Sequence, residues 1–342
     1  RIKETTVDMG AYESFYSSLT CPPANNLHIR EINLYSATVS WRGNSETYRL
    51  RYKKSGTHNY SYYIVSDTTY TFTNLDPITQ YDWSVQALCN YGGDSSVFIS
   101  GESFLTCPSF NQENRTWYVS QSNGLESNYG ESVASPALNL STVLNCPCLQ
   151  DNDTILIANG TYTPYYQTDT NDNRTRTFYI DKNIFIKGGY SDDFLSQDLT
   201  TYPTILSGER GIQYDITDNS YHVLYFAVSG LSALVENCII TEGNANGSVT
   251  STQYGGGSYG GNFLNCIFYG NNALNGGAVY NSNMKNCDLY SNTAVNNGGG
   301  IYADLAGVTI SDCSITNNQV VTSNTSSHGG GIYAKSITVT NC

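Results

Sequence analysis

A short phrase repeated between Glu236 and Cys342 constrains the fold more than any other feature of the chain. An Asn-Cys or Asp-Cys pair followed by a strand-like run occurs at Cys238, Cys266, Cys287 and Cys313, and begins again at Cys342. Between the copies, two or three glycines precede a tyrosine, in Gly255–Tyr259, Gly276–Tyr280, Gly298–Tyr302 and Gly329–Tyr333. Successive cysteines are between 21 and 29 residues apart. Self-similarity at this period predicts a solenoid.

The repeat unit favours strands over helices. The shortest unit has too few residues for a pair of helices. Each cysteine and the apolar residue two positions later point to the same side, as alternate residues of a strand do. Asn, Asp and Gly separate the runs, and these residues tolerate the left-handed backbone that a sharp turn requires. The sequence therefore predicts a right-handed parallel β-helix.

Stacking of such coils predicts two internal ladders. Coils repeat at about 4.8 Å, so equivalent residues lie directly above one another. The five cysteines then form a buried column of thiols, and they are not metal ligands because no histidine accompanies them. Asn271, Asn292 and Asn318 each follow their cysteine by five residues. We expect them to form a ladder of amide hydrogen bonds at a turn.

Composition supports an all-β chain and excludes some partners. The chain has 342 residues, with 29 Tyr and 31 Gly but only 2 Met, and 13% of its residues are charged. This is the composition of strands and turns. A formal net charge of −13 argues against nucleic acid or an anionic membrane as a partner. No apolar run approaches the roughly 18 residues of a membrane span, so we expect no membrane insertion.

The two ends of the chain indicate a fragment of a longer modular protein. Residues 1–14 include Val7–Glu13, which resembles the phrase that closes bacterial surface β-helix domains. We therefore assign residues 1–14 to the end of a preceding β-helix, and Cys342 lies just inside a new coil. Neighbouring modules of the same chain are expected partners, and any export signal would lie elsewhere.

Residues 15–109 follow a different pattern, with short strands about ten residues apart that predict a sandwich. Trp41, Leu75, Pro77, Tyr81 and Ala87 stand where a fibronectin type III domain has its signature residues, and the segment resembles that family. The resemblance implies that Trp41 lies in the core and that the Tyr81 hydroxyl bonds to nearby backbone. It also places the start of the first strand and the end of the sixth at one pole. On that topology we predict a disulfide between Cys21 and Cys89.

Residues 110–342 form the predicted β-helix, incomplete at its C-terminus. Pro136, followed by Leu140, Val143 and Leu144, predicts a short capping helix with proline at its first position. Such a helix would cover the open end of the first coil. Strand-like runs follow at Ile155–Ala158, Phe178–Ile180, Ile184–Lys187 and Thr204–Ser207. Cys146 and Cys148 lie outside the column, and either is a candidate partner for Cys107.

Several phrases of this region resemble a group of bacterial surface β-helix proteins. The matching phrases are Asp153–Pro164, Lys187–Tyr190, Thr204–Gly208 and the Asn-Cys and Gly-Gly repeats. They are similar to proteins of the Bacteroidota that are related to the polymorphic outer-membrane protein repeats. The resemblance implies an exported protein at the cell surface, often secreted by the type IX system, that acts as an adhesin.

The sequence offers little for catalysis. Some β-helix proteins cleave polysaccharides, and they need several carboxylates on one face. The candidates are Asp192, Asp193, Asp198, Asp169, Asp172 and Asp181, but none recurs along the strands. His28, His58, His222 and His328 have no nucleophile partner at a recognised spacing. We expect no catalytic residues, and a polysaccharide lyase or hydrolase, or a glycan-binding module, is the alternative.

Two kinds of minor site remain. Asp169, Asn171 and Asp172 supply oxygen ligands for calcium, although the glycine and glutamate of an EF-hand loop are missing, and a solvated loop is the alternative. No other cofactor is expected. Asp153-Thr154-Ile155 and Asp67-Thr68-Thr69 resemble the short O-glycosylation signal of such bacteria, which makes Thr154 and Thr68 candidate acceptors.

Two insertions mark the predicted binding face. Asn244–Tyr254 and Gln319–His328 fall in the same part of the first and fourth units. Both are rich in Ser, Thr and Asn. Insertions on one face of a solenoid commonly form its binding face, whereas the alternative is a pair of tolerated surface loops. The sequence therefore favours a non-enzymatic adhesin or stalk that binds a glycan or a protein surface.

Overall fold

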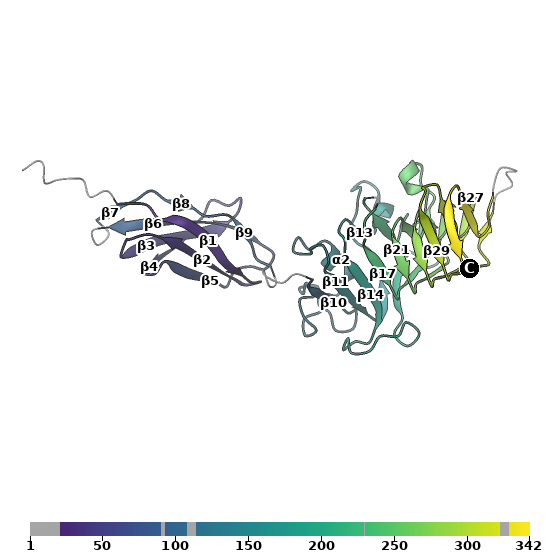
Figure 1. Ribbon diagram of the computed structural model, residues 1–342, viewed down its shortest axis with the longest axis horizontal. Coiled ribbons are helices and arrows are strands. Elements are labelled where there is room, and N and C mark those ends of the chain that lie inside the picture. The colour runs from purple at the N-terminus through teal and green to yellow at the C-terminus, as the bar shows by residue number, and fades with distance from the viewer. Residues whose placement is uncertain (1–20, 90–92, 108–113, 229, 322–327) are drawn as a thin grey trace, which may run out of the picture. The chain divides into compact units, whose positions relative to one another are not determined.

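The computed structural model describes residues 21–89, 93–107, 114–228, 230–321 and 328–342. The chain divides into two compact units, residues 1–112 and 113–342 (Figure 1). The sequence-based boundary lies at 109/110. Residues 1–14, with the predicted end of a preceding β-helix, are outside the described residues. Each unit is described separately below.

The first unit is an antiparallel β-sandwich. One sheet has the order β1-β2-β5, and the other has the order β4-β3-β6-β7 with β8 and β9 also paired to β6. The strands are β1 (Asn25–Ile32), β2 (Ser36–Arg42), β3 (Thr47–Lys54), β4 (Ser61–Val65), β5 (Thr69–Thr73), β6 (Gln80–Cys89), β7 (Asp94–Ser95), β8 (Ile99–Ser100) and β9 (Phe104–Leu105). Alternate residues of the long strands face inward, as the period of two requires.

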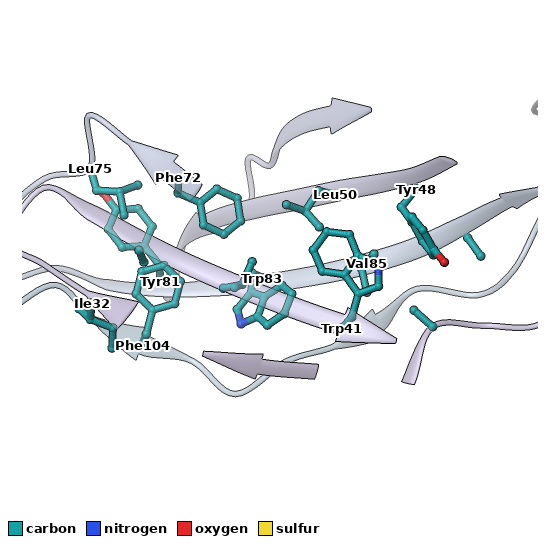
Figure 2. Close-up of a cluster of buried hydrophobic side chains, with 14 residues drawn as sticks. Ile32, Trp41, Tyr48, Leu50, Phe72, Leu75, Tyr81, Trp83, Val85 and Phe104 are labelled. Carbon is teal, nitrogen blue, oxygen red and sulfur yellow. The ribbon is translucent and has the colours of Figure 1, made fainter. Parts of the chain in front are cut away.

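Large aromatic side chains fill the space between the two sheets (Figure 2). Trp41 and Trp83 are almost fully buried there, so Trp41 is a core residue, as the resemblance implied. The Tyr81 hydroxyl accepts a hydrogen bond from the backbone N–H of Asp76 at 2.9 Å. This bond fixes the corner that leads into β6.

Cys21 and Cys89 form the disulfide that the sandwich topology predicts, with their Cα atoms 5.7 Å apart. It ties the segment before β1 to the end of β6. The distance lies within the normal range for a disulfide. Neither Cys107 nor Cys148 is a free thiol, because each is disulfide-bonded, whereas Cys146 is free and buried.

The second unit is a parallel β-helix whose coils contribute strands to four parallel sheets. The first sheet contains β10 (Thr116–Val119), β11 (Thr154–Ala158), β14 (Phe185–Tyr190), β17 (Leu234–Glu236), β21 (Asn262–Leu264), β25 (Asn283–Lys285), β29 (Val308–Ser311) and β33 (Ile337–Thr340). The second contains β12 (Gly160–Tyr162), β15 (Thr204–Ser207), β18 (Ile239–Thr241), β22 (Ile267–Tyr269), β26 (Asp288–Tyr290) and β30 (Ser314–Thr316).

The other two sheets complete the coil. The third, which we call the tyrosine sheet, contains β13 (Phe178–Ile180), β16 (Leu224–Phe226), β20 (Ser258–Tyr259), β24 (Val279–Tyr280), β28 (Ile301–Ala303) and β32 (Ile332–Ala334). The fourth contains β19 (Asn244–Ala245), β23 (Asn272–Asn275), β27 (Thr293–Asn297) and β31 (Gln319–Val320). Two short 3-10 turns, η3 (Asn173–Thr175) and η4 (Thr250–Thr252), lie in the connections.

The cysteine column forms in the predicted register. Cys238, Cys266, Cys287 and Cys313 are buried free thiols between the first and second sheets. The backbone N–H of Cys287 lies 3.4 Å from the Sγ of Cys313 on the next coil. Cys342 is exposed, unlike the internal position expected for it, because no described coil covers it. The residues just before these five cysteines adopt the left-handed conformation, at Asn237, Asn265, Asn286, Asp312 and Asn341.

The asparagine ladder also forms. The Nδ2 of Asn271 donates to the Oδ1 of Asn292 at 3.0 Å, and the Nδ2 of Asn292 donates to the Oδ1 of Asn318 at 2.9 Å. Asn271 and Asn292 are fully buried. Each amide also donates to a backbone carbonyl of the preceding coil, which satisfies polar groups that a turn inside the solenoid would otherwise leave without partners.

The capping helix starts later than the sequence suggests. Helix α2 spans Leu140–Leu144, and its N-cap is Asn139, whose side chain accepts a hydrogen bond from the backbone N–H of Ser141. Pro136 therefore lies before the helix and not at its first position. The N-cap asparagine determines the start, because its amide oxygen satisfies an N–H that the first turn leaves unpaired. Leu140, Val143 and Leu144 are buried, and the helix contacts β10 and β13.

Candidate ligand-binding surface: a ladder of tyrosines

Six tyrosines form a continuous ladder on the outer face of the tyrosine sheet. Strands β13, β16 and β28 of that sheet place buried residues on either side of one outward tyrosine, as Phe178 and Ile180 do around Tyr179. The members, in order along the coils, are Tyr179, Tyr225, Tyr259, Tyr280, Tyr302 and Tyr333. All six are half-buried, since each ring covers part of its neighbours. The parallel register therefore converts a sequence repeat into a surface stripe.

The rings of the ladder pack closely. Centroids of successive rings are between 4.8 Å and 6.0 Å apart. Most pairs are nearly parallel, but the planes of Tyr259 and Tyr280 are 49° apart, so these two faces are not fully covered by each other. Burial raises the pKa of Tyr259, Tyr280 and Tyr302, so these phenols stay neutral hydrogen-bonding groups at physiological pH.

The two insertions named in the sequence analysis end against this ladder. Tyr254, the last residue of the first insertion, packs against Tyr280 and Tyr302 with centroids 4.8 Å and 5.4 Å away. His328, the last residue of the second, lies 6.2 Å from Tyr333. Residues 322–327 of the second insertion are outside the described residues. The predicted flank is therefore the edge of the tyrosine stripe.

The start of the first insertion needs a correction. Asn244 is buried and belongs to β19, where it pairs with Asn272 of the next coil, so it is not part of an exposed loop. Gln319 likewise begins β31. In the first insertion the added residues follow β19, because the repeat continues through that strand before the extra residues begin. The exposed part of the first insertion is limited to residues 246–253.

A hollow of about 440 Å³ lies along one side of the ladder. Its lining includes Tyr225, Tyr259 and Tyr280, with the Gly260-Gly261 turn and Asn262. Gly260 and Gly261 have φ of 78° and 108°, and a Cβ on Gly261 would collide with the ring of Phe226. The next coil has Asn281 and Ser282 at the equivalent positions, so this turn lacks side chains where its neighbour has them.

A second hollow of about 280 Å³ is lined by Tyr179, Tyr221, His222 and Arg174. The Arg174 guanidinium donates to the carbonyl oxygens of Asn219 and Asn244, both at 2.7 Å, and lies 4.2 Å from the centre of the Tyr221 ring. Tyr225 and Ala227 line this hollow and also the larger one. The two hollows are therefore adjoining parts of one groove beside the ladder.

His222 links the first insertion to the solenoid. Its Nδ1 lies 2.9 Å from the carbonyl oxygen of Gly255, and its Nε2 lies 2.8 Å from that of Ser251 in η4. Burial lowers the pKa of His222. The ring also contacts Tyr225 and Tyr259, so the insertion, the histidine and the ladder form one packed group.

The calcium candidates serve the loop that contains them. Asp169 Oδ1 accepts from the backbone N–H and from the Nδ2 of Asn171. Asp172 caps η3 through Arg174 N–H and accepts from the Tyr221 hydroxyl at 3.0 Å. Among the residues that the structure describes, no group of three His, Cys, Asp or Glu side chains could hold a metal ion. Calcium binding here stays a prediction.

The glycosylation candidates differ in accessibility. Thr154 is half-buried at the start of β11, between Thr116 and Phe185 of the neighbouring strands. The preceding Asp153 is buried and accepts from Trp117 Nε1 at 2.8 Å, so it is a core residue. Thr68 lies in the turn between β4 and β5, beside the exposed Asp67. Modification at either residue stays a prediction.

The remaining carboxylates are used in local turns. Asp192 accepts from the Nδ2 of Asn159, Asp193 from the Ser191 hydroxyl, and Asp198 from Thr201 N–H. Asp181 pairs with Lys182.

No helix in the described ranges is both long and apolar enough to cross a membrane.

The comparison with protein families concerns the first unit. Residues 22–101 match the fibronectin type III domain, in agreement with the sandwich and its tyrosine corner. The sandwich is a fibronectin type III domain. The chain as a whole matches no curated protein.

The chain is also similar to solved structures of single β-sandwich domains. A crystal structure of an FN3 domain of human collagen XX is 21% identical, covering 25% of this chain and 93% of that one with a TM-score of 0.23. A solution structure of the fn3 domain of the human collagen α-1(XX) chain is 24% identical, covering 28% and 95%, with a TM-score of 0.24. A computationally redesigned β-sandwich protein is 24% identical, covering 25% and 96%, with a TM-score of 0.23.

The glycine runs mark Tyr259, Tyr280, Tyr302 and Tyr333 as repeat positions, but a ladder of tyrosines was not predicted, and Tyr179 and Tyr225 stand outside the repeat phrase. These two lie in coils without the Asn-Cys phrase. A usable signal was present in Phe178-Tyr179-Ile180 and Leu224-Tyr225-Phe226, where one tyrosine stands between two apolar residues. The sequence does not reveal the groove, because its lining comes from several coils that lie together only once they are stacked.

Proposed function

We propose that this chain is a non-enzymatic segment of an exported bacterial cell-surface protein, in which the β-helix serves as an adhesive stalk. A fibronectin type III domain with a disulfide is consistent with a modular extracellular protein. The observation that carries the adhesive role is the tyrosine ladder with two insertions at its edge. Tyrosine supplies contact area and a hydrogen-bonding hydroxyl at low entropic cost.

The chemistry of the ladder supports binding without turnover. Asp304, a carboxylate beside the ladder, accepts hydrogen bonds from the Tyr280 hydroxyl at 3.0 Å and from Asn281 Nδ2 at 2.8 Å. Acid–base cleavage of a glycosidic bond needs a second carboxylate opposite the first. Among the described residues that line the two hollows there is no Asp or Glu, and Asp304 and Asp172 each accept a hydrogen bond from a tyrosine hydroxyl. The proposal therefore assigns the groove to recognition.

Adhesion assays with the full chain test this proposal. Beads coated with the chain should adhere to glycan-bearing or matrix-coated surfaces, and a variant lacking residues 247–253 should adhere less. This deletion leaves one residue between Ala245 and Tyr254, as the next coil has one residue between their partners Ala273 and Asn275. Circular dichroism checks that the variant stays folded without the contact between His222 and Ser251. Equal adhesion by the variant and by uncoated beads would reject the adhesive role. Release of new reducing ends from polysaccharides by the chain would instead favour the enzyme alternative.

A further inference from the structure

We propose that the groove beside the tyrosine ladder binds a neutral glycan chain, with its centre at Tyr225 and Ala227. This inference rests on the proposed adhesive function and names the ligand class and the site. The groove has two adjoining parts that share these two residues. Their volumes, about 440 Å³ and 280 Å³, lie near the lower limit of roughly 300 Å³ for small-molecule sites. Such a groove suits several consecutive sugar units better than one compact ligand.

The lining of the larger hollow matches the two faces of a pyranose ring. One side presents the rings of Tyr225, Tyr259 and Tyr280, whose electron-rich faces and edges pack against sugar C–H groups. The tilt of 49° between Tyr259 and Tyr280 leaves ring surface that their stacking does not cover. Another side presents amides that pair with sugar hydroxyls. Aromatic carbon beside fixed amides is the combination that a neutral polyol requires.

The amides in the larger hollow are held in place before any ligand arrives. Asn262 donates through Nδ2 to the carbonyl oxygens of Leu231 and Ala233 at 3.0 Å and 2.9 Å. Its Oδ1 accepts from Asn283 Nδ2 at 2.9 Å. Within the described residues, one lone pair on Asn262 Oδ1 and one N–H of Asn283 Nδ2 therefore remain for a ligand. Groups fixed in this way bind without a further ordering cost.

The charge of the groove argues for a neutral ligand. The chain carries a net charge of −13, and Asp304 lies beside the ladder at Tyr280, so a polyanion would be repelled. Arg174 in the smaller hollow already donates to two carbonyl oxygens. A peptide that adds to a sheet needs an open strand edge. Strands β16, β20 and β24 are each paired on both sides, so the groove offers no such edge.

Three variants test the site. Ala227→Phe adds bulk where the two hollows meet and removes no ladder ring. Tyr225→Ala removes the ring that both hollows share. Leu305→Glu places a charge at the rim, where the residue is 51% exposed and substitution leaves the core intact. The matched control is Tyr269→Ala, which removes one outward ring of a stacked pair on the second sheet, away from the groove.

Binding to the full chain is measured by calorimetry with soluble neutral β-1,4-glucan, β-1,3-glucan and α-mannan fragments of roughly five units, about one per rung at 4.8 Å. Heparin, hyaluronan and a random peptide pool serve as competing probes. We expect at least one neutral fragment to bind, and its affinity to fall about tenfold or more in Ala227→Phe, Tyr225→Ala and Leu305→Glu but not in Tyr269→Ala.

Unchanged affinity in the folded Leu305→Glu and Ala227→Phe variants overturns the site, and binding of only the polyanions or peptides overturns the ligand class. So does the absence of binding by every neutral fragment. Circular dichroism confirms the fold of each variant, and the rim variant keeps the test decisive if the others are unstable. Adhesion of beads that persists in Tyr225→Ala would leave the adhesive function standing while rejecting this groove as its cause.

Discussion

At the scale of single residues, burial decides which thiols react. Cys238, Cys266, Cys287 and Cys313 are buried, whereas Cys342 is exposed. Burial raises the pKa of Cys238 to about 12. A hydrogen bond with the Cys266 thiol raises the pKa of Cys287. Only a thiolate reacts quickly with alkylating reagents. We therefore expect the column to act as a packing device.

We expect iodoacetamide at pH 8 to modify Cys342 in the native protein and to spare the four column residues. Peptide mass spectrometry after a short reaction checks this. The same reaction in denaturant is the control, and it should modify all five. Rapid native labelling of Cys266 or Cys287 would contradict the coil register.

His222 makes the stability of the second unit depend on pH. Burial lowers its folded pKa below the ordinary 6.5, so the unfolded chain binds the proton more readily. The stability that the neutral His222 ring contributes is fully present above pH 6.5 and is lost as the pH falls through the folded pKa. The carbonyl oxygens of Gly255 and Ser251 oppose this lowering of the pKa, because they favour the protonated ring.

We expect the free energy of unfolding of the native chain to fall more steeply below about pH 6.5 than that of His222→Gln. Urea denaturation between pH 5 and 8 measures the difference. His28→Gln, at an exposed position of β1, is the matched control and should follow the native curve. Parallel curves for the native chain and His222→Gln would show that the histidine does not titrate on unfolding.

At the scale of elements, the glycine runs do two separate tasks. Gly276 has φ of 67°, which ordinary residues rarely adopt. Gly277 has no such conformation, but a Cβ there would lie 2.6 Å from the carbonyl oxygen of Thr293 and 2.7 Å from its nitrogen. From the sequence pattern, turns alone were expected to account for these glycines. The second task, close approach of neighbouring coils, becomes visible only in the stacked structure.

Gly277→Ala should therefore destabilise the second unit by about 2–3 kcal/mol, because backbone on two sides would have to move. Gly331→Ala is the control, since its added Cβ would meet only the side chain of Ile315 at 3.4 Å. Chemical denaturation of the two variants gives the comparison. Equal losses in both would refute the close-approach explanation.

At the scale of the whole molecule, we expect the two compact units to unfold in separate transitions. The disulfide between Cys21 and Cys89 closes a segment with a sequence separation of 68 residues in the first unit. The cysteines of the solenoid column remain free. Cross-links stabilise a fold mainly by restricting the unfolded chain.

The double variant Cys21→Ser/Cys89→Ser should lower the unfolding free energy of the sandwich by about 2–4 kcal/mol and leave the solenoid transition in place. Differential scanning calorimetry distinguishes the two transitions. The single variant Cys146→Ser, at a buried free thiol of the second unit, is the control for replacing a cysteine by serine without breaking a disulfide. A shift of both transitions in the double variant would contradict independent unfolding.

The sequence by itself determined the elements that depend on local pattern. The Asn-Cys and glycine repeats fixed the solenoid, its cysteine column and its asparagine ladder, because a parallel register stacks every equivalent residue. Alternating core residues and the Tyr81 corner likewise fixed the sandwich. Only the tertiary structure decided the candidate site. Tyr179 and Tyr225 join the ladder from coils without the repeat phrase, and the groove forms where the Gly260-Gly261 turn and Asn262 meet the rings of three successive strands. Such a surface depends on contacts between stacked coils, which no single stretch of sequence contains.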